Sequence, residues 1–175
     1  RVPAPQLMLL GQVTAPQPGE LIDFLNGHLG SADVLVQVAG EFEVLYSGRA
    51  ASTADAGDFL LMLKGDGSLQ IHSHRGVKPV NWQPQTDALD LSIEDGSAVL
   101  LSERRTPPEF VRVSFLEVAF AQALQLKELT GFMLIGSEAE MQRALARDPE
   151  VIEPVLTLVD REVPTGVGGI DLYAR

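Results

Sequence analysis

The stretch FLLMLKGDGSLQIHSH, residues 59–74, decides the fold class of this chain. Its apolar halves flank the pair Asp66-Gly67, which supplies the positive φ angles that a tight hairpin turn needs. The stretch ALDLSIEDGSAVLLSE, residues 88–103, repeats this pattern around Asp95-Gly96. Each stretch therefore predicts two antiparallel strands joined by a short turn.

Strand-like alternation continues on both sides of these hairpins. Apolar side chains alternate at period 2 in DVLVQVAG (33–40) and in EFEVLYSG (41–48), and EFVRVSF (109–115) is a further strand candidate. ELIDFLNGHL (20–29) instead has the apolar spacing of a helix. Up to about residue 117 we expect a mainly β domain, either an antiparallel sandwich or a half-open barrel.

The character of the sequence changes after this domain. In SEAEMQRALARDP, Ser137 precedes Glu140 by three residues, which is the capping-box spacing of a helix start. The final residues, GGIDLYAR, are typical of a strand that carries Asp171 opposite its apolar face. We expect a β-rich domain over 1–118, a linker over 119–130 and the start of an α/β domain over 131–175.

Composition excludes some chemistry. The 175 residues contain no cysteine, so disulfides, thiolate metal sites and cysteine nucleophiles are impossible. The net charge of −11 argues against a general nucleic-acid coat, because phosphate binding depends on local positive charge. Residues 67–86 lack acidic side chains, however, and include Arg75 and Lys78. This gap is either a local site for a polyanion or a chance feature of an acidic protein.

The segment HSHRGVKPVNW (72–82) lies in this gap. Its His-x-His pair could chelate a metal ion, but without a third ligand the pair is a weak zinc signal. Arg75 and Lys78 could contact phosphates, and Trp82 offers a wide aromatic face for a base. The alternative is a core tryptophan beside a turn that proline fixes.

Two further places hold candidate site residues. In YSGRA (46–50), Tyr46 and Arg49 form either a solvated pair or a site that contacts a base and a phosphate. The second possibility requires that the 72–82 segment lie nearby. Glu138 and Asp171 could hold half of a metal site, because convergent carboxylates bind the ions that activate water for phosphodiester hydrolysis. Equally, Glu138 could merely complement the dipole of a helix N-terminus.

Three stretches together resemble the NucS/EndoMS family of mismatch-directed DNA endonucleases. They are YSGRAAS, LKGDGSLQIHSHRGVKPVNWQP and the run from GSEAEMQRAL to GGIDLYAR. The resemblance implies a β-rich domain that binds DNA and forms a homodimer, followed by a RecB-like nuclease domain that uses Mg²⁺ or Mn²⁺. Family enzymes grip duplex DNA, flip mismatched bases onto aromatic side chains and cleave both strands.

The resemblance also assigns roles to individual residues. Tyr46 and Trp82 look like the base-stacking aromatics. Glu138 and Asp171 resemble catalytic acids, with Asp171 as the metal ligand, and Glu153 and Glu162 match family positions less closely. The resemblance favours a strand over residues 118–126, where composition favours a helix. The expected DNA contacts are Arg49, Arg75, Lys78 and Asn81.

The resemblance finally sets expectations about activity and setting. The family pattern continues beyond Asp171 with a Glu-x-Lys motif, so we expect these 175 residues to bind DNA without cutting it. Family enzymes are cytoplasmic and nucleoid-associated, and many bind a sliding clamp through a C-terminal tail. The alternatives are a module for single-stranded or branched DNA without mismatch specificity, and a β-sandwich interaction protein unrelated to DNA.

Overall fold

The computed structural model of the chain describes residues 7–127, 138–147, 158–165 and 168–174. These residues fall into two compact units, Arg1–Leu129 and Thr130–Arg175. Among the described residues, no helix is both long enough and apolar enough to cross a membrane.

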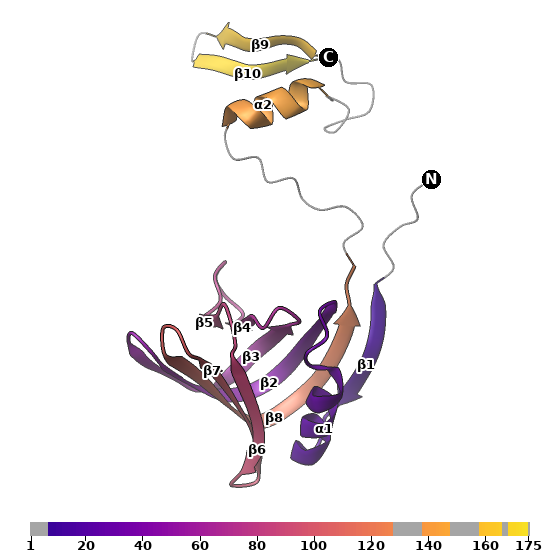
Figure 1. Cartoon of the computed structure of the whole chain (residues 1–175), viewed down its shortest axis with the longest axis vertical. Helices are drawn as coiled ribbons and strands as arrows, with labels where there is room; N and C mark the ends of the chain where they lie inside the picture. The colour runs from indigo at the N-terminus through magenta and orange to yellow at the C-terminus, as the bar shows by residue number, and fades with distance from the viewer. Residues whose placement is uncertain (1–6, 128–137, 148–157, 166–167, 175) are drawn as a thin grey trace. The chain divides into compact units, whose positions relative to one another are not determined.

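The first unit is one curled antiparallel sheet with a single described helix, α1 (Figure 1). The main path of the sheet has the order β5-β4-β3-β2-β8-β7-β6, and β1 pairs separately with β8. The elements are β1 Met8–Thr14, α1 Pro18–His28, β2 Val34–Ser47, β3 Ala51–Lys64, β4 Leu69–His72, β5 Asn81–Gln83, β6 Ala88–Glu94, β7 Ser97–Arg104 and β8 Glu109–Gln125.

Strand β8 is the spine of this sheet. On one edge it pairs with β2 over residues 110–125. Its other edge is divided, because β7 pairs with residues 109–115 and β1 pairs with residues 120–125. Strand β8 therefore separates two wings of the sheet, with β2, β3, β4 and β5 on one side and β7 and β6 on the other.

A glycine permits this curl at the middle of β2. Gly40 pairs with Val118, and the register between β2 and β8 shifts on both sides of this pair. A Cβ atom at Gly40 would lie 2.2 Å from the backbone oxygen of Glu117, so only glycine lets the two strands approach this closely.

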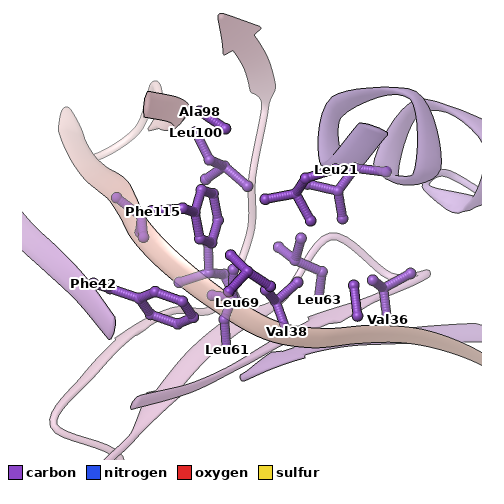
Figure 2. Packing of buried hydrophobic residues seen from close by; sticks show 14 of the residues in the cluster. Leu21, Val36, Val38, Phe42, Leu61, Leu63, Leu69, Ala98, Leu100 and Phe115 are labelled. Atoms are coloured by element: carbon purple, nitrogen blue, oxygen red, sulfur yellow. The ribbon is translucent and has the colours of Figure 1, made fainter. Parts of the chain in front are cut away.

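The core fills the concave side of the curled sheet. Figure 2 shows Leu21 of α1 reaching towards leucine and phenylalanine side chains that come from the sheet. The rings of Phe42 and Phe115 meet edge to face, with their centroids 4.9 Å apart. Helix α1 thus closes the apolar interior, as the spacing at 20–29 predicts.

Buried polar side chains join the two wings. Gln83 of β5 and Ser102 of β7 are both 0% exposed, although β5 and β7 are not neighbours in the sheet order. The amide nitrogen of Gln83 donates to the backbone oxygen of Ser102 at 3.4 Å, and Thr86 donates its hydroxyl to the Gln83 amide oxygen at 3.0 Å. This network holds the short strand β5 against β7, which lies in the other wing of the sheet.

The predicted mainly β domain is confirmed as a half-open barrel, with three local corrections. Only Gly67 has a positive φ in the 66–67 turn, whereas both residues do in the 95–96 turn. Residues 33–40 and 41–48 are one strand, β2, because Gly40 is a point of close approach rather than a turn. Strand β8 continues to Gln125, so residues 119–125 belong to the first unit rather than to a linker.

The second unit contains α2 Glu138–Arg147, β9 Leu158–Thr165 and β10 Gly168–Ala174. Strands β9 and β10 form a two-stranded antiparallel sheet. The predicted helix and the predicted final strand are both present. Ser137, the expected cap of that helix, lies outside the described residues.

Candidate functional site

An open pocket of about 440 Å³ lies where three parts of the first unit meet. We call it the aromatic pocket. The end of β2 and the turn into β3 form one side, β5 and its flanks form the second, and the β7–β8 hairpin forms the third. Its lining residues are Tyr46, Arg49, Ser52, Val80, Asn81, Trp82, Pro84, Arg104, Pro107 and Glu109.

The Trp82 side of the pocket depends on the alternation of β5. Successive residues of a strand point to opposite faces, so Trp82 points outward when Gln83 points inward. Gln83 is fully buried in its network with Ser102, whereas Trp82 is 55% exposed. The alternative of a core tryptophan is therefore wrong. The buried glutamine determines where the exposed indole lies.

The Tyr46 side is held by a carboxylate from β8. The hydroxyl of Tyr46 donates a hydrogen bond of 3.0 Å to Oε2 of Glu109. This hydrogen bond and partial burial raise the pKa of Tyr46, while Arg49 acts in the opposite direction. The other oxygen of Glu109, Oε1, lies 3.8 Å from Nη1 of Arg104. One carboxylate thus connects a ring and a guanidinium group of the same pocket.

The charge of the pocket differs from that of the chain. Two lining residues, Arg49 and Arg104, are cationic, and one, Glu109, is anionic. The lining is therefore positive by one charge, in a chain whose net charge is −11. Such local positive charge beside aromatic faces is the combination that binds unpaired nucleotides.

Unsatisfied polar atoms also gather at this pocket. Among the described residues, three buried side-chain atoms lack a hydrogen-bond partner: Asn81 Oδ1, Arg104 Nε and Glu109 Oε1. All three belong to residues that line the pocket. Glu109 Oε1 still faces the Arg104 guanidinium, but a buried polar atom without a hydrogen bond costs about 1–3 kcal/mol, so the concentration of three at one place is typical of a site built for a purpose other than stability.

The structure brings four of the six predicted DNA-binding residues into the aromatic pocket: Tyr46, Arg49, Asn81 and Trp82. Arg75 and Lys78 are not among the lining residues. They lie in the exposed loop of residues 73–80, which leads directly into β5. Their predicted phosphate contacts are compatible with this exposure and stay predictions.

Sequence reasoning missed Arg104 and Glu109. They are direct partners across the β7–β8 hairpin, but Glu109 is 63 residues from the tyrosine that it contacts. The only local signal is a pair of opposite charges on either side of a proline-rich turn. That pattern is common, and nothing in it points to Tyr46.

The predicted metal ligands lie in the second unit. Glu138 is the first residue of α2, and Asp171 lies in β10 between two residues that pair with β9. Glu162 belongs to β9, whereas Glu153 lies outside the described residues. Within the described ranges, no three His, Asp or Glu residues form a group that could hold a metal ion. His72 Nε2 instead lies 3.2 Å from Gln70 Oε1.

Comparison with known proteins identifies relatives. Residues 32–131 match a family described as the endonuclease NucS N-terminal PH-like domain. The chain is 34% identical to endonuclease NucS of Thermococcus kodakarensis over 93% of its own length and 64% of that protein. It is also 34% identical to endonuclease NucS 2 of Halobacterium salinarum, covering 95% of this chain and 66% of that protein. It therefore spans about two thirds of these relatives.

Solved structures agree with these sequence matches. A structure of an EndoMS–dsDNA complex superposes with a TM-score of 0.68 at 32% identity, over 99% of this chain and 70% of that one. EndoMS in its apo form gives a TM-score of 0.61 at 30% identity, over 88% of this chain and 65% of that one. The likeness covers both sequence and fold.

Proposed function

The chain belongs to the family of the endonuclease NucS N-terminal PH-like domain, and on this premise we propose that it is the DNA-gripping part of a mismatch-directed endonuclease. The whole protein would hold duplex DNA as a dimer, flip mismatched bases onto aromatic side chains and cleave both strands with a divalent metal ion. The name of the relatives supports the nuclease activity, and the EndoMS–dsDNA complex supports DNA as the partner.

One observation carries the proposed base recognition: Tyr46 and Trp82 line the same open pocket. Its volume of about 440 Å³ lies within the range of ~300–1,000 Å³ typical of ligand sites. The exposed indole offers its face for stacking, and the guanidinium groups of Arg49 and Arg104 lie at the same pocket, where they can attract a phosphate.

The energetics favour a mismatched base over a paired one. Flipping a base out of a duplex costs a few kcal/mol, and least at a mismatch. Stacking on an aromatic side chain returns about 1–3 kcal/mol per base. Because the two quantities are similar, a small reduction in the flipping cost decides whether the flipped state is populated.

The cleavage step would take place in the second unit. Glu138 and Asp171 are the residues that we expect to hold Mg²⁺ or Mn²⁺, since carboxylates suit both ions. When bound, the ion would lower the pKa of a coordinated water and so supply the nucleophile for phosphodiester hydrolysis. The family resemblance adds a Glu-x-Lys motif to such a site, and these 175 residues contain no Glu-x-Lys sequence. We therefore expect the 175-residue chain to bind DNA and leave it uncut.

A homodimer has one supporting feature in the described residues. Among the described strands, β1 pairs only with β8, so it forms an edge of the sheet, and its residues Met8, Leu9 and Leu10 are exposed. A free apolar edge is a ready surface for a second copy. A sliding clamp as partner and a nucleoid-associated location rest on the family resemblance.

The alternative is a module for single-stranded or branched DNA without mismatch specificity. The solvent-exposed indole favours it, because a base already outside a duplex could reach the pocket at no flipping cost. Both the mismatch endonuclease and the single-strand module would bind DNA through its phosphates, so phosphate contacts do not distinguish them. Only the comparison of mismatched with matched duplexes separates them.

A gel-shift comparison tests the proposal. The chain is titrated against one duplex with a G·T mismatch, the matched duplex and the single strand, at several salt concentrations. We expect the mismatched duplex to bind most tightly, with affinity that falls as salt rises. Equal binding of the two duplexes with tighter binding of the single strand would favour the alternative, and salt-independent or absent binding would refute both. Incubation with Mg²⁺ or Mn²⁺ should leave the mismatched duplex intact.

A further inference from the structure

We infer that Glu109 is a positioning residue of the aromatic pocket, which fixes the Tyr46 ring in the orientation that receives a base. The inference rests on the proposed function and deepens it, because it assigns a role to a residue that neither the resemblance nor the sequence pattern singles out. Glu109 would act through the tyrosine rather than by contact with the base.

Strand geometry places this carboxylate beside the phenol. Tyr46 pairs with Val111 of β8, and the next residue of β2 pairs with Phe110. Glu109 therefore stands at the end of the paired segment, where its side chain reaches the tyrosine hydroxyl at 3.0 Å. Two strands that are far apart in the chain thus fix the distance between ring and acid.

The carboxylate also has a cationic neighbour. Glu109 and Arg104 are cross-strand partners in the β7–β8 hairpin, and Arg104 Nη1 lies 3.8 Å from Glu109 Oε1. One oxygen thus faces a guanidinium group while the other accepts a hydrogen bond from the phenol. An acceptor fixed in this way specifies one direction for the Tyr46 hydroxyl.

Gly48 encloses the phenol from the third side. A Cβ atom at this position would lie 2.5 Å from the hydroxyl oxygen and 2.9 Å from Cζ of Tyr46, and 3.0 Å from Cβ of Glu109. A side chain at position 48 would therefore displace the ring, the acid or both. Tyr46 and Glu109 both line the aromatic pocket, so this close contact lies at the pocket wall.

The contact has a functional consequence. A side chain that must be ordered when a ligand binds reduces affinity, whereas one already ordered does not. A fixed Tyr46 ring would meet a flipped base without that loss. The raised pKa of Tyr46 is consistent with a phenol that keeps its proton and donates a hydrogen bond to a carboxylate.

The test uses three substitutions in the 175-residue chain. Glu109→Ala removes the acceptor, Glu109→Gln keeps an acceptor oxygen without the charge, and Tyr46→Phe keeps the ring without the hydroxyl. The quantity measured is the ratio of affinities for a G·T duplex and its matched duplex. This ratio cancels the general gain in DNA binding that follows from removing a negative charge.

We expect Glu109→Ala and Tyr46→Phe each to reduce the ratio about two- to tenfold, and Glu109→Gln to keep most of it. Thermal unfolding of each variant verifies the fold. If Glu109→Ala does not fold, Tyr46→Phe and Glu109→Gln carry the test. An unchanged ratio in Tyr46→Phe, or an equal loss in Glu109→Gln and Glu109→Ala, would overturn the inference.

A second measurement needs no DNA and so separates this inference from the proposed function. The chain has two tyrosines, and Tyr173→Phe leaves Tyr46 as the single phenol, which ultraviolet absorbance can titrate. We expect its pKa above the ordinary value of about 10, and lower in both Glu109 variants. A phenol pKa that no Glu109 variant changes would refute the contact. A wild-type chain without mismatch preference but with the shifted phenol would refute only the proposed function.

Discussion

Two neighbouring motifs of the first unit carry the family resemblance, and the structure places them in different surroundings. The first is KGDGS, the turn of residues 64–68, and the second is RGVKP, residues 75–79 of the loop 73–80. The turn is packed against backbone on two sides. The loop is exposed, and its Val77 is fully accessible to solvent.

Close packing explains the turn. A Cβ atom at Gly65 would lie 2.2 Å from the backbone oxygen of Ser31 and 2.5 Å from that of Ala32. On its other side, the backbone oxygen of Gly67 accepts a hydrogen bond of 2.9 Å from the backbone N–H of Thr86. The turn therefore joins the segment before β2 to the segment before β6.

The loop has a different character. Arg75 and Lys78 are exposed, and the described hydrogen bonds of the loop side chains are confined to Ser73 and the backbone of Arg75. The comparison shows that one block of family-like sequence can combine a motif needed for folding with one suited to binding. Sequence resemblance alone does not tell the folding motif from the binding motif. Close backbone contacts do, because only the folding motif has them.

Among the variants that test this difference between turn and loop, Gly65→Ala should have the largest effect on stability. The added methyl group must displace backbone rather than a flexible side chain, so we expect a loss of about 1–3 kcal/mol in the free energy of unfolding. Urea unfolding followed by circular dichroism measures it. Fluorescence of Trp82, the only tryptophan of the chain, reports on the first unit alone.

Gly27→Ala is the matched control. Gly27 lies within α1, and a Cβ atom there would meet nothing within 4 Å. Because alanine favours a helix over glycine, this variant should gain up to about 1 kcal/mol. Similar losses in both variants would show that close packing at the 64–68 turn is not what the glycine provides.

The fold was largely predictable where one local rule suffices. Period-2 alternation and the turns at Asp66-Gly67 and Asp95-Gly96 predicted two hairpins that the structure contains. The division of β2 was wrong because a glycine inside a strand and a glycine in a turn have the same local sequence signal. Only the backbone of β8, 77 residues beyond Gly40, distinguishes them.

The same reasoning explains β8. The composition of residues 118–126 favours a helix, but the segment is flanked by β1 and β2 and forms a strand through Gln125. Pairing on both edges outweighs intrinsic propensity. The family resemblance predicted this strand, because a family pattern reflects the pairing of strands in the whole fold. The composition of one segment does not contain that information.

The pocket shows where sequence reasoning ends. Resemblance pointed to Tyr46 and Trp82, and the structure places both in one pocket. It did not point to Glu109, because an acid at the end of a strand has no distinctive pattern. The contact between Glu109 and Tyr46 arises only from the register of β2 with β8.

A second prediction separates the loop from the pocket beside it. Trp82→Ala removes an exposed stacking face, so it should reduce the mismatch-to-matched affinity ratio about tenfold. Arg75→Ala removes an exposed cation. It should weaken all DNA about equally and reduce the salt dependence of binding by about one phosphate contact. Gel shifts over a salt series measure both quantities.

Stability is the control for this pair. Both side chains are exposed, so neither substitution should lower the free energy of unfolding by more than about 0.5 kcal/mol. Equal losses of mismatch preference from the two variants would contradict the separate roles. Loss of matched-duplex binding in Trp82→Ala alone would assign the indole to general DNA contact.

The smallest effect is expected from Asp66, at the exposed side of the 64–68 turn. Its Oδ1 accepts hydrogen bonds from the hydroxyl of Ser68 at 2.7 Å and from the Ser68 backbone N–H at 2.9 Å. These bonds lower the pKa of Asp66 below its usual value of 3.8. Because the folded pKa is the lower one, the charged carboxylate stabilises the fold above pH 4 and this contribution disappears as the pH falls through the folded pKa.

Asp66→Asn should therefore destabilise the chain at neutral pH by at most a few tenths of a kcal/mol, since solvent screens an exposed group. The difference from the wild type should shrink steadily below about pH 4. Ser68→Ala, which removes the hydroxyl donor, should reduce the same pH-dependent difference. Urea midpoints between pH 2.5 and 7 measure it, and a difference that grows with acidity would contradict the role of these hydrogen bonds in the turn.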